Sequence, residues 1–387
     1  MKNSSLRYLT PGLALAVFSA GVGRAGTAQM SAKESVDKNV VEPLKEKTWC
    51  EKLFGLATIY KGDDSDWLNE FAITGRYHGQ FWAADSETGS DEDWENRRFR
   101  IGARAVLFQK KLELKAEIFS NLDNDDDGFY DGFTDLHARV MIDPAFNITI
   151  GKQKPKYGWE WTTSSRVILT FERSQLSNQF RGDYAPGVSI DGKVDKWSYY
   201  GGVFASDPDE EFGDFDGGTT AIASVGYDLK EAFGVDKALW RLDFMYTDQD
   251  DGDTIFNWFD TGVSTSLEFK QGQWGLNAEA QYGSGQSDAF GIMIQPYYDI
   301  TKKLQVVASY QFAWSDEDEG LRPQSRYERE VGGTNGDLYN AIYAGLNYYI
   351  CEHKLKLMGG VEYANMDGGS GPGYDGWTAF AGVRVYW

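Results

Sequence analysis

The stretch Asn69-Glu-Phe-Ala-Ile-Thr-Gly-Arg-Tyr-His-Gly-Gln-Phe-Trp82 alternates in the character of its side chains. One parity carries the apolar set Phe71, Ile73, Tyr77 and Phe81, and the other carries the polar set Thr74, Arg76, His78 and Gln80. Successive side chains of a β-strand point to opposite faces. The stretch therefore predicts a strand with one apolar face and one wet face.

The alternation returns along the chain, and the connections between alternating segments fall into two classes. Long, mostly acidic connections are predicted at residues 83–95, 121–133, 156–186, 206–218, 249–260, 315–337 and 366–376. Shorter ones, several with Lys, are predicted at residues 109–111, 143–146, 193–196, 230–238, 271–272, 301–303 and 351–354. Barrels that cross an outer membrane alternate long outer loops with short periplasmic turns. We therefore predict an all-β fold, a transmembrane antiparallel β-barrel of about 16 strands, rather than a soluble sandwich.

The N-terminal part of the chain has a different pattern. Lys2 and Arg7 precede an apolar stretch, and small residues follow at Ala25 to Ala28, so residues 1–28 are predicted to be a signal peptide. Residues 29–66 lack strand alternation and are expected to form a periplasmic N-terminal segment, and residues 67–387 form the barrel domain. No later segment approaches the roughly 18 apolar residues of a spanning helix. The expected location is the outer membrane of a diderm bacterium, with its lipid as a partner.

The net charge and the positions of the aromatic residues agree with an outer-membrane barrel. The net charge of −21 excludes nucleic acid as an expected partner, because phosphate binding needs a clustered basic surface. The last predicted strand, residues 378–387, ends in Trp387. Aromatic residues near strand ends suit the girdles where an apolar ring meets water. The girdle candidates are Trp82, Trp197, Trp240, Trp274, Trp314 and Trp377.

The polar parity of the first predicted strands is rich in cations. It carries Arg76, Arg98, Arg100, Arg104, Lys115 and Arg139. Arg and Lys inside a pore lower the entry barrier for anions. Carboxylates on the same parity leave open a second reading, in which these cations pair across neighbouring strands. The carboxylates are Glu113, Glu117, Asp135, Asp243 and Glu279.

A dense motif leaves the strand that ends near Gly151. It comprises Gly151, Lys154, Pro155, Thr163 to Ser165, Glu172 to Ser174, Arg181, Asp183, Gly187 and Val188. This run resembles the phosphate-selective porin O and P family, and Gly75-Arg76 and Arg97-Arg98-x-Arg100 are similar to the family as well. The resemblance implies a sixteen-stranded barrel, usually a homotrimer, whose third outer loop folds inward. It also implies that Lys154, Arg173 and Arg181 face a permeating anion opposite Arg76, Arg98 and Arg100, with Lys152, Lys156 and Arg166 as weaker candidates.

Two further features carry separate hypotheses. Asp123, Asp125 and Asp127 precede Gly128 as in the first half of a calcium loop, but the twelfth position is Thr134, so a calcium site and a solvated acidic loop both stay open. Cys50 lies in the N-terminal segment and Cys351 in a predicted periplasmic turn, so a disulfide could join them. Two idle thiols are the alternative.

We expect no enzyme and no cofactor other than this candidate calcium. The chain has three histidines, His78, His137 and His353, and none lies near a nucleophile motif such as Gly-x-Ser-x-Gly. The expected function is passive diffusion of small anionic solutes, phosphate or polyphosphate among them, through a constriction lined by Arg and Lys. The alternatives are a non-transporting structural or adhesive barrel and a sugar-selective porin, whose inward aromatics would be Tyr200, Phe204 and Tyr297.

Overall fold

The computed structural model describes residues 47–120, 122, 129–205, 211, 218–248, 255–256 and 258–387. The predicted signal peptide and calcium candidates Asp123, Asp125 and Asp127 therefore lie outside the described residues. The wall strands are β2 (Leu68–Ser86), β3 (Gly89–Leu107), β4 (Leu112–Ser120), β5 (Phe133–Asp143), β6 (Phe146–Gln153), β7 (Ala185–Val194), β8 (Trp197–Ala205), β9 (Thr219–Asp228), β10 (Lys237–Thr247), β11 (Phe259–Gln271), β12 (Trp274–Gly285), β13 (Ala289–Asp299), β14 (Leu304–Ser315), β15 (Leu338–Tyr349), β16 (Leu355–Asp367) and β17 (Tyr374–Tyr386).

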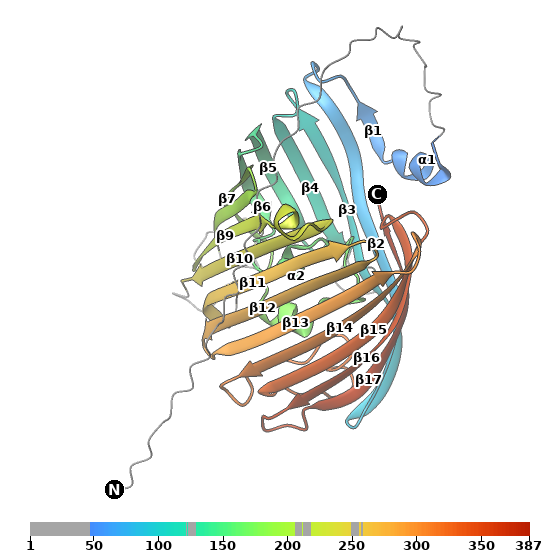
Figure 1. Ribbon diagram of the computed structural model, residues 1–387, viewed down its shortest axis with the longest axis vertical. Helices are drawn as coiled ribbons and strands as arrows, with labels where there is room; N and C mark the ends of the chain where they lie inside the picture. Colours follow the sequence, from blue (N-terminus) through green and yellow to red (C-terminus); the bar gives the residue numbers. More distant parts are fainter. Residues whose placement is uncertain are drawn as a thin grey trace, which may run out of the picture. The chain divides into compact units, whose positions relative to one another are not determined.

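These sixteen strands close on themselves, which confirms the predicted fold class. Each is antiparallel to the next along the chain, and β17 returns to pair with β2 from Gly376↔Ser86 to Tyr386↔Arg76 (Figure 1). Closure leaves every wall strand with a neighbour on both sides, so the backbone groups are satisfied without water. Both ends of the wall, at Leu68 and Tyr386, lie on the same side of the barrel.

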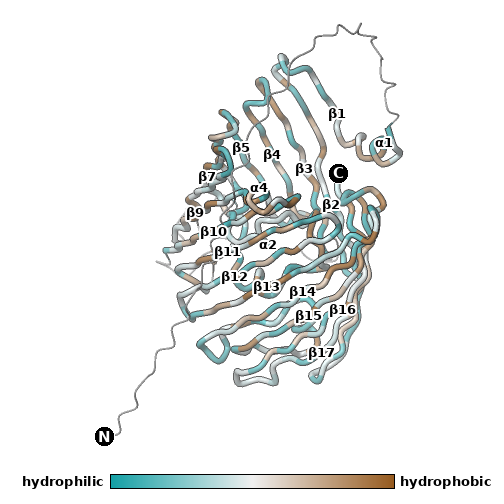
Figure 2. Tube along the Cα trace, in the orientation of Figure 1, coloured by the Kyte–Doolittle hydropathy of each residue, from teal (hydrophilic) through white to brown (hydrophobic). Residues whose placement is uncertain are grey.

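The two faces of the wall follow the period-two pattern. In β15, Leu346 is 51% exposed and its neighbour Asn347 is fully buried in the lumen. Figure 2 shows hydrophobic and hydrophilic positions interleaved along the strands. The outward apolar side chains form the surface that lipid covers in an outer-membrane barrel. Trp197, Trp274, Trp314 and Trp377 are exposed on this face, as girdle residues should be.

Two predictions about local structure are wrong. Trp82 is buried in the barrel interior instead of lying in a girdle, because its parity is that of Gln80 and Ala84 on the lumenal face. Residues 83–95 are not a long loop but a β-hairpin, in which Ala83 pairs with Glu92 and Asp85 with Ser90. The acidic run is compatible with a strand because Asp91, Glu92 and Asp93 are exposed to water, while Glu95 forms an ion pair with Arg326.

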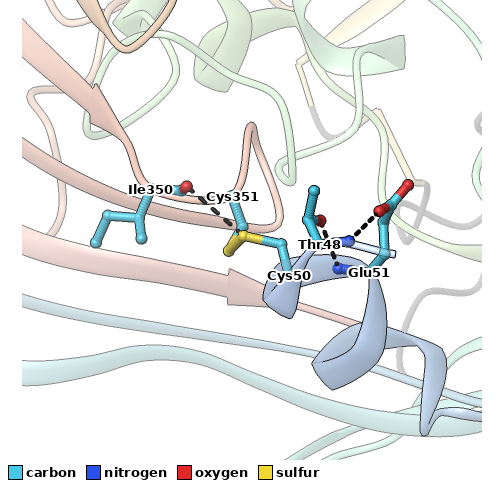
Figure 3. Close-up of a disulfide and its surroundings, with 5 residues drawn as sticks. All are labelled: Thr48, Cys50, Glu51, Ile350 and Cys351. Carbon is cyan, nitrogen blue, oxygen red and sulfur yellow. Dashed lines mark hydrogen bonds between the residues drawn. A yellow bond between two sulfur atoms is a disulfide. The ribbon is translucent and has the colours of Figure 1, made fainter. Parts of the chain in front are cut away.

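The N-terminal clip, residues 47–61, contains helix α1 (Trp49–Gly55) and strand β1 (Thr58–Lys61). Thr48 begins the helix with a capping box to Glu51. No strand was predicted in this segment, but β1 pairs with β2 at residues 70–72. This part of β2 precedes Gly75, where the pairing of the C-terminal end with β2 stops at Trp387. Cys50 and Cys351, in the turn between β15 and β16, are joined by a disulfide with a Cα separation of 5.6 Å (Figure 3).

Two outer connections fold into the barrel. The first inner loop, residues 154–184, contains α2 (Trp159–Thr162) and α3 (Gln175–Phe180), and the second inner loop is residues 316–337. Phe171 and Phe180 of the first loop stack on wall residues Phe380 and Phe259, at centroid distances of 5.2 and 4.6 Å. Tyr327 of the second loop packs edge-on against Phe380. Aromatic contacts of this kind hold both loops against the lumenal wall.

The remaining helix, α4 (Lys230–Phe233), lies in the turn between β9 and β10. Among the residues with described structure, no helix is long and apolar enough to cross a membrane, which by itself says nothing of strands.

Candidate functional site: a cation-lined cavity in the barrel lumen

The start of the first inner loop is fixed to one side of the wall. The backbone N–H of Gly158 donates to Asp243 of β10 at 3.0 Å, and the N–H of Glu160 donates to Glu279 of β12 at 3.0 Å. Gly158 has a φ of +74°, and a Cβ there would lie 2.7 Å from the amide of Gln281. A glycine is therefore required for the chain to turn this close to the wall.

The middle of the same loop is fixed to the other side of the wall. Three of its carbonyls accept hydrogen bonds from wall side chains: Ile168 from Lys356 at 2.5 Å, Leu169 from Asn347 at 2.9 Å and Phe171 from Arg384 at 3.1 Å. These donors lie on β16, β15 and β17. The loop therefore spans the lumen from β10–β12 to β15–β17, and it narrows the barrel from within.

The second inner loop packs onto α3 of the first. Gln179 donates to the carbonyl of Gly320 at 2.8 Å, and Gln175 donates to the carbonyl of Arg322 at 2.5 Å. On its other side, Arg326 forms an ion pair with Glu95 of β3 at 2.5 Å. The second loop thus bridges the first loop and the wall, which places its arginines beside the strands that carry the predicted basic wall.

Between the two loops and strands β2 to β6 lies a cavity of about 880 Å³. Of the side chains the structure describes around it, twelve are cationic and four are carboxylates. The cations are Arg76, Arg97, Arg98, Arg100, Lys115, Lys152, Lys154, Arg173, Arg181, Arg322, Arg326 and Arg329. The carboxylates are Asp131, Asp135, Asp183 and Glu211.

Glu117 of β4 is the main counter-charge behind the wall. Its carboxylate is fully buried and lies 2.8 Å from Arg76, 3.3 Å from Arg166, 3.7 Å from Arg100 and 3.9 Å from Lys115. One negative charge therefore faces four positive ones. The cluster keeps a local positive excess although each of its cations has an acidic neighbour.

Glu172 of the first inner loop is the counter-charge of Arg97 and Arg98. Its carboxylate accepts two hydrogen bonds from Arg97, at 2.7 and 3.0 Å, and one from Arg98 at 3.5 Å. Burial by itself would raise the pKa of Glu172, but the charges of Arg97 and Arg98 hold it well below its usual value. Glu172 therefore stays ionised and orients both guanidinium groups.

Trp161 of α2 gathers the loop cations. Lys154, Arg173 and Arg181 lie 3.9, 4.9 and 4.8 Å from its ring centroid. Arg173 also donates to the carbonyls of Glu160 and Thr163, so it holds the loop conformation as well as lining the cavity. Burial, followed by the charge of Arg173, lowers the pKa of Lys154 well below its usual value.

The candidates from the sequence separate into two groups. Arg76, Arg98, Arg100, Lys154, Arg173 and Arg181 line the cavity together. Arg104 and Arg139 do not line it: Arg104 forms ion pairs with Glu70 and Glu113, and Arg139 binds Asp191 through two hydrogen bonds of 2.6 and 2.7 Å. These two follow the pairing alternative that the sequence left open.

The weaker candidates also differ in their positions. Lys152 lines the cavity and pairs with Glu211 at 2.7 Å. Lys156 lies over the ring of Tyr200, 5.0 Å from its centroid, and Arg166 binds Glu117. Tyr200 and Phe204 are buried among the packed core residues, so they do not present the open aromatic surface that a sugar-selective pore needs.

The sequence did not point to four lining arginines. Arg97 stands on the apolar parity of its strand, but the register of β2 and β3 shifts between His78 and Gln80, so two residues of β3 oppose one of β2. Such a bulge redirects side chains, and it turns Arg97 to Glu172. Arg322, Arg326 and Arg329 lie in the second inner loop, for which no inward path was predicted.

The comparison with family models decides the classification, because the model of the phosphate-selective porin O and P family matches residues 71–368. The chain belongs to this family. The porin is therefore an outer-membrane channel protein, and its location in the outer membrane agrees with the prediction. The family and the fold are those of a channel rather than of an enzyme.

Solved structures resemble this porin in fold at low sequence identity. Pseudomonas putida OprB has a TM-score of 0.61 at 12% identity, over 82% of this chain and 94% of that one. An anion-selective porin from Comamonas acidovorans has a TM-score of 0.54 at 10% identity, over 82% and 99%. The trimer form of Vibrio cholerae OmpT has a TM-score of 0.53 at 14% identity, over 82% and 99%. A search of curated protein sequences found no match.

Proposed function

We propose that this porin conducts small anions by passive diffusion, and that the selectivity arises at the cavity between the inner loops and β2 to β6. The observation that supports the proposal is the excess of cationic over acidic side chains around the cavity, twelve against four among the residues described. A cluster of one sign in a low-dielectric cleft concentrates ions of the opposite sign. Anions would therefore enter more readily than cations.

The path would start at the second inner loop. Arg181, Arg322 and Arg329 lie on the loops, and Arg98 and Arg100 lie on the wall behind them. An anion that leaves water near the loop arginines would exchange part of its hydration for N–H donors and then pass to the wall. Several sites of moderate strength permit conduction, whereas a single strong site would hold the ion.

Phosphate is a reasonable member of the permeant set. The guanidinium group is a planar fork of donors that matches phosphate and carboxylate oxygens. Arg76, Arg98 and Arg100 offer three such forks on adjacent strands. The anion selectivity named for the Comamonas acidovorans porin of similar fold supports the same class of solute.

We also propose that the protein assembles as a homotrimer. The support is the fold shared with the trimer form of Vibrio cholerae OmpT. Native mass spectrometry of the protein extracted in mild detergent gives a direct measurement. A mass of three chains is expected, and a single-chain mass at all concentrations would contradict the assembly.

The test of anion conduction is single-channel recording in planar bilayers under a salt gradient, with phosphate then added against the chloride current. We expect a reversal potential of anion-selective sign and a reduction of the chloride current by phosphate. A reversal potential of cation-selective sign would contradict the proposal. A complete lack of conductance would favour the non-transporting structural or adhesive barrel instead.

A further inference from the structure

The cavity has an aromatic lining as well as a cationic one. Four aromatic residues border it: Phe119, Tyr130, Phe133 and Tyr184. Trp161 also lines it, with the loop cations packed around its ring. Phe119 and Phe133 come from β4 and β5, and Tyr184 comes from the end of the first inner loop. An inorganic anion is bound by hydrogen-bond donors and positive charge, and it gains little from contact with apolar ring surface.

Arg100 connects the two linings. Its guanidinium lies 5.4 Å from the ring centroid of Phe119 and 5.2 Å from that of Tyr184, and it donates to the Tyr184 hydroxyl at 2.9 Å. The rings of Tyr130 and Phe133 meet edge-on at 5.8 Å, and Tyr130 is about half exposed. A cationic donor is thus flanked by aromatic rings, with further exposed ring surface next to it.

The size of the cavity agrees with an organic solute. Sites for drug-sized molecules enclose roughly 300–1,000 Å³ and combine apolar walls with a few polar groups that fix orientation. The cavity of about 880 Å³ lies within that range. It has room for a ring several times the size of a phosphate ion.

We propose that the preferred permeants are organic anions with a flat aromatic body, in particular aromatic carboxylates. This inference rests on the proposed anion function and specifies the solute class of the same cavity. The carboxylate is received by Arg98 and Arg100, and the ring packs against Phe133 and Tyr184. Nη1 of Arg98 has no hydrogen-bond partner within the described part of the chain, which leaves one donor of the wall for the solute.

The first test compares benzoate with cyclohexanecarboxylate as blockers of the chloride current through the wild-type channel. The two anions have the same charge and similar size, but only benzoate is flat and aromatic. Aromatic pairs and cation–π contacts predict half-block by benzoate at a roughly three- to tenfold lower concentration. Equal concentrations for the two anions would overturn the inference.

The second test replaces the rings. Phe133→Leu and Phe119→Leu remove aromatic character while they keep an apolar side chain, and they should reduce the benzoate preference at least threefold without changing the block by phosphate. The control is Phe244→Leu on β10, whose ring is exposed on the outer face of the wall. A benzoate preference that persists in both lumenal variants would also overturn the inference.

The outcomes separate the two proposals. If phosphate blocks the current and benzoate acts no better than cyclohexanecarboxylate, anion conduction stands and the aromatic preference fails. If the channel is cation-selective, both fail. If a lumenal variant does not fold, the comparison of the two carboxylates on the wild-type protein still decides the matter.

Discussion

At the scale of single residues, the positive character of the cavity depends on how few carboxylates serve many cations. Glu117 lies within 4 Å of Arg76, Arg100, Arg166 and Lys115. Arg104, by contrast, has both Glu70 and Glu113 as partners. Arg100 and Arg104, which both lie on β3, therefore have different electrostatic surroundings and can be compared by mutation.

Neutralising the wall should reduce anion selectivity. Replacing Arg98 and Arg100 together by Gln should lower the chloride-to-potassium permeability ratio by about tenfold, because the focusing of anions by the cluster is lost. The ratio is obtained from the reversal potential under a salt gradient. Arg104→Gln is the control and should leave the ratio within about twofold, since Arg104 does not line the cavity. An equal effect of all these substitutions would show that the position within the lumen is unimportant.

Glu160 of the first inner loop should make the channel sensitive to pH. Burial, assisted by the charge of Glu279 from β12, raises its pKa to about 7, although hydrogen bonds from Ser174 and the charge of Arg173 act in the opposite direction. The neutral form of Glu160 is favoured in the folded loop. Its contribution to the stability of that loop is therefore present at low pH and is lost as the pH rises through about 7. We expect more current fluctuation at pH 8.5 than at pH 5.5.

Glu160→Gln is the variant that tests this assignment. Gln keeps the shape of the protonated side chain but cannot ionise, so the fluctuations should become nearly independent of pH over the same range. The control is Glu92→Gln in the exposed outer hairpin, which should retain the pH dependence of the wild type. Unchanged pH dependence in Glu160→Gln would assign the effect to another group.

At the scale of elements, the disulfide should stabilise the N-terminal clip rather than the barrel. It joins residues 301 positions apart, and β1 has only a short pairing with β2 at residues 70–72. Replacing Cys50 and Cys351 by Ser should lower the opening free energy of residues 49–61 by about 2–4 kcal/mol. Hydrogen exchange followed by mass spectrometry measures this, and the conductance should be unchanged.

A reductant provides an independent control for the clip. Wild-type protein treated with dithiothreitol should show the same faster exchange in residues 49–61, and the double Ser variant should not respond to it. Slow exchange that persists without the disulfide would mean that strand pairing alone holds the clip in place.

At the scale of the whole molecule, the barrel depends on the separation of a lipid-facing and a lumenal surface. Ile342 lies in the middle of β15 and is 58% exposed on the outer face, while Ile300 is 44% exposed in the periplasmic turn between β13 and β14. Ile342→Arg should lower the free energy of unfolding by about 2–4 kcal/mol, because a cation is costly near the bilayer midplane. Ile300→Arg should cost less than about 1 kcal/mol.

Reversible unfolding by urea in lipid vesicles measures both substitutions. A similar loss for Ile342→Arg and Ile300→Arg would contradict the assignment of β15 to the membrane-spanning wall. A large loss for Ile342→Arg alone would agree with the closed sheet and its outer apolar band.

The sequence by itself determined the barrel, because alternation with a period of two is a local property of each strand. Residues 69–82 show it within fourteen positions, and the order of long and short connections follows from the same pattern. The likeness to the family in residues 151–192 indicated the first inner loop in the same way. Local patterns gave a wrong prediction at residues 83–95, where a run of acidic residues suggested a loop but forms a hairpin. They also gave the wrong face for Arg97, because the bulge in β3 changes the side-chain alternation there.

Only the tertiary structure decided which cations act together. The cavity joins side chains that are far apart in the chain, such as Arg76 with Ser165, 89 positions away, and Arg100 with Tyr184, 84 positions away. Whether an arginine is matched by a carboxylate, as Arg139 is by Asp191, depends on such neighbours rather than on its own strand. The path of the second inner loop is set by packing in the lumen, which has no periodic signature in the sequence, so its three arginines became visible only when the loops and the wall were brought together.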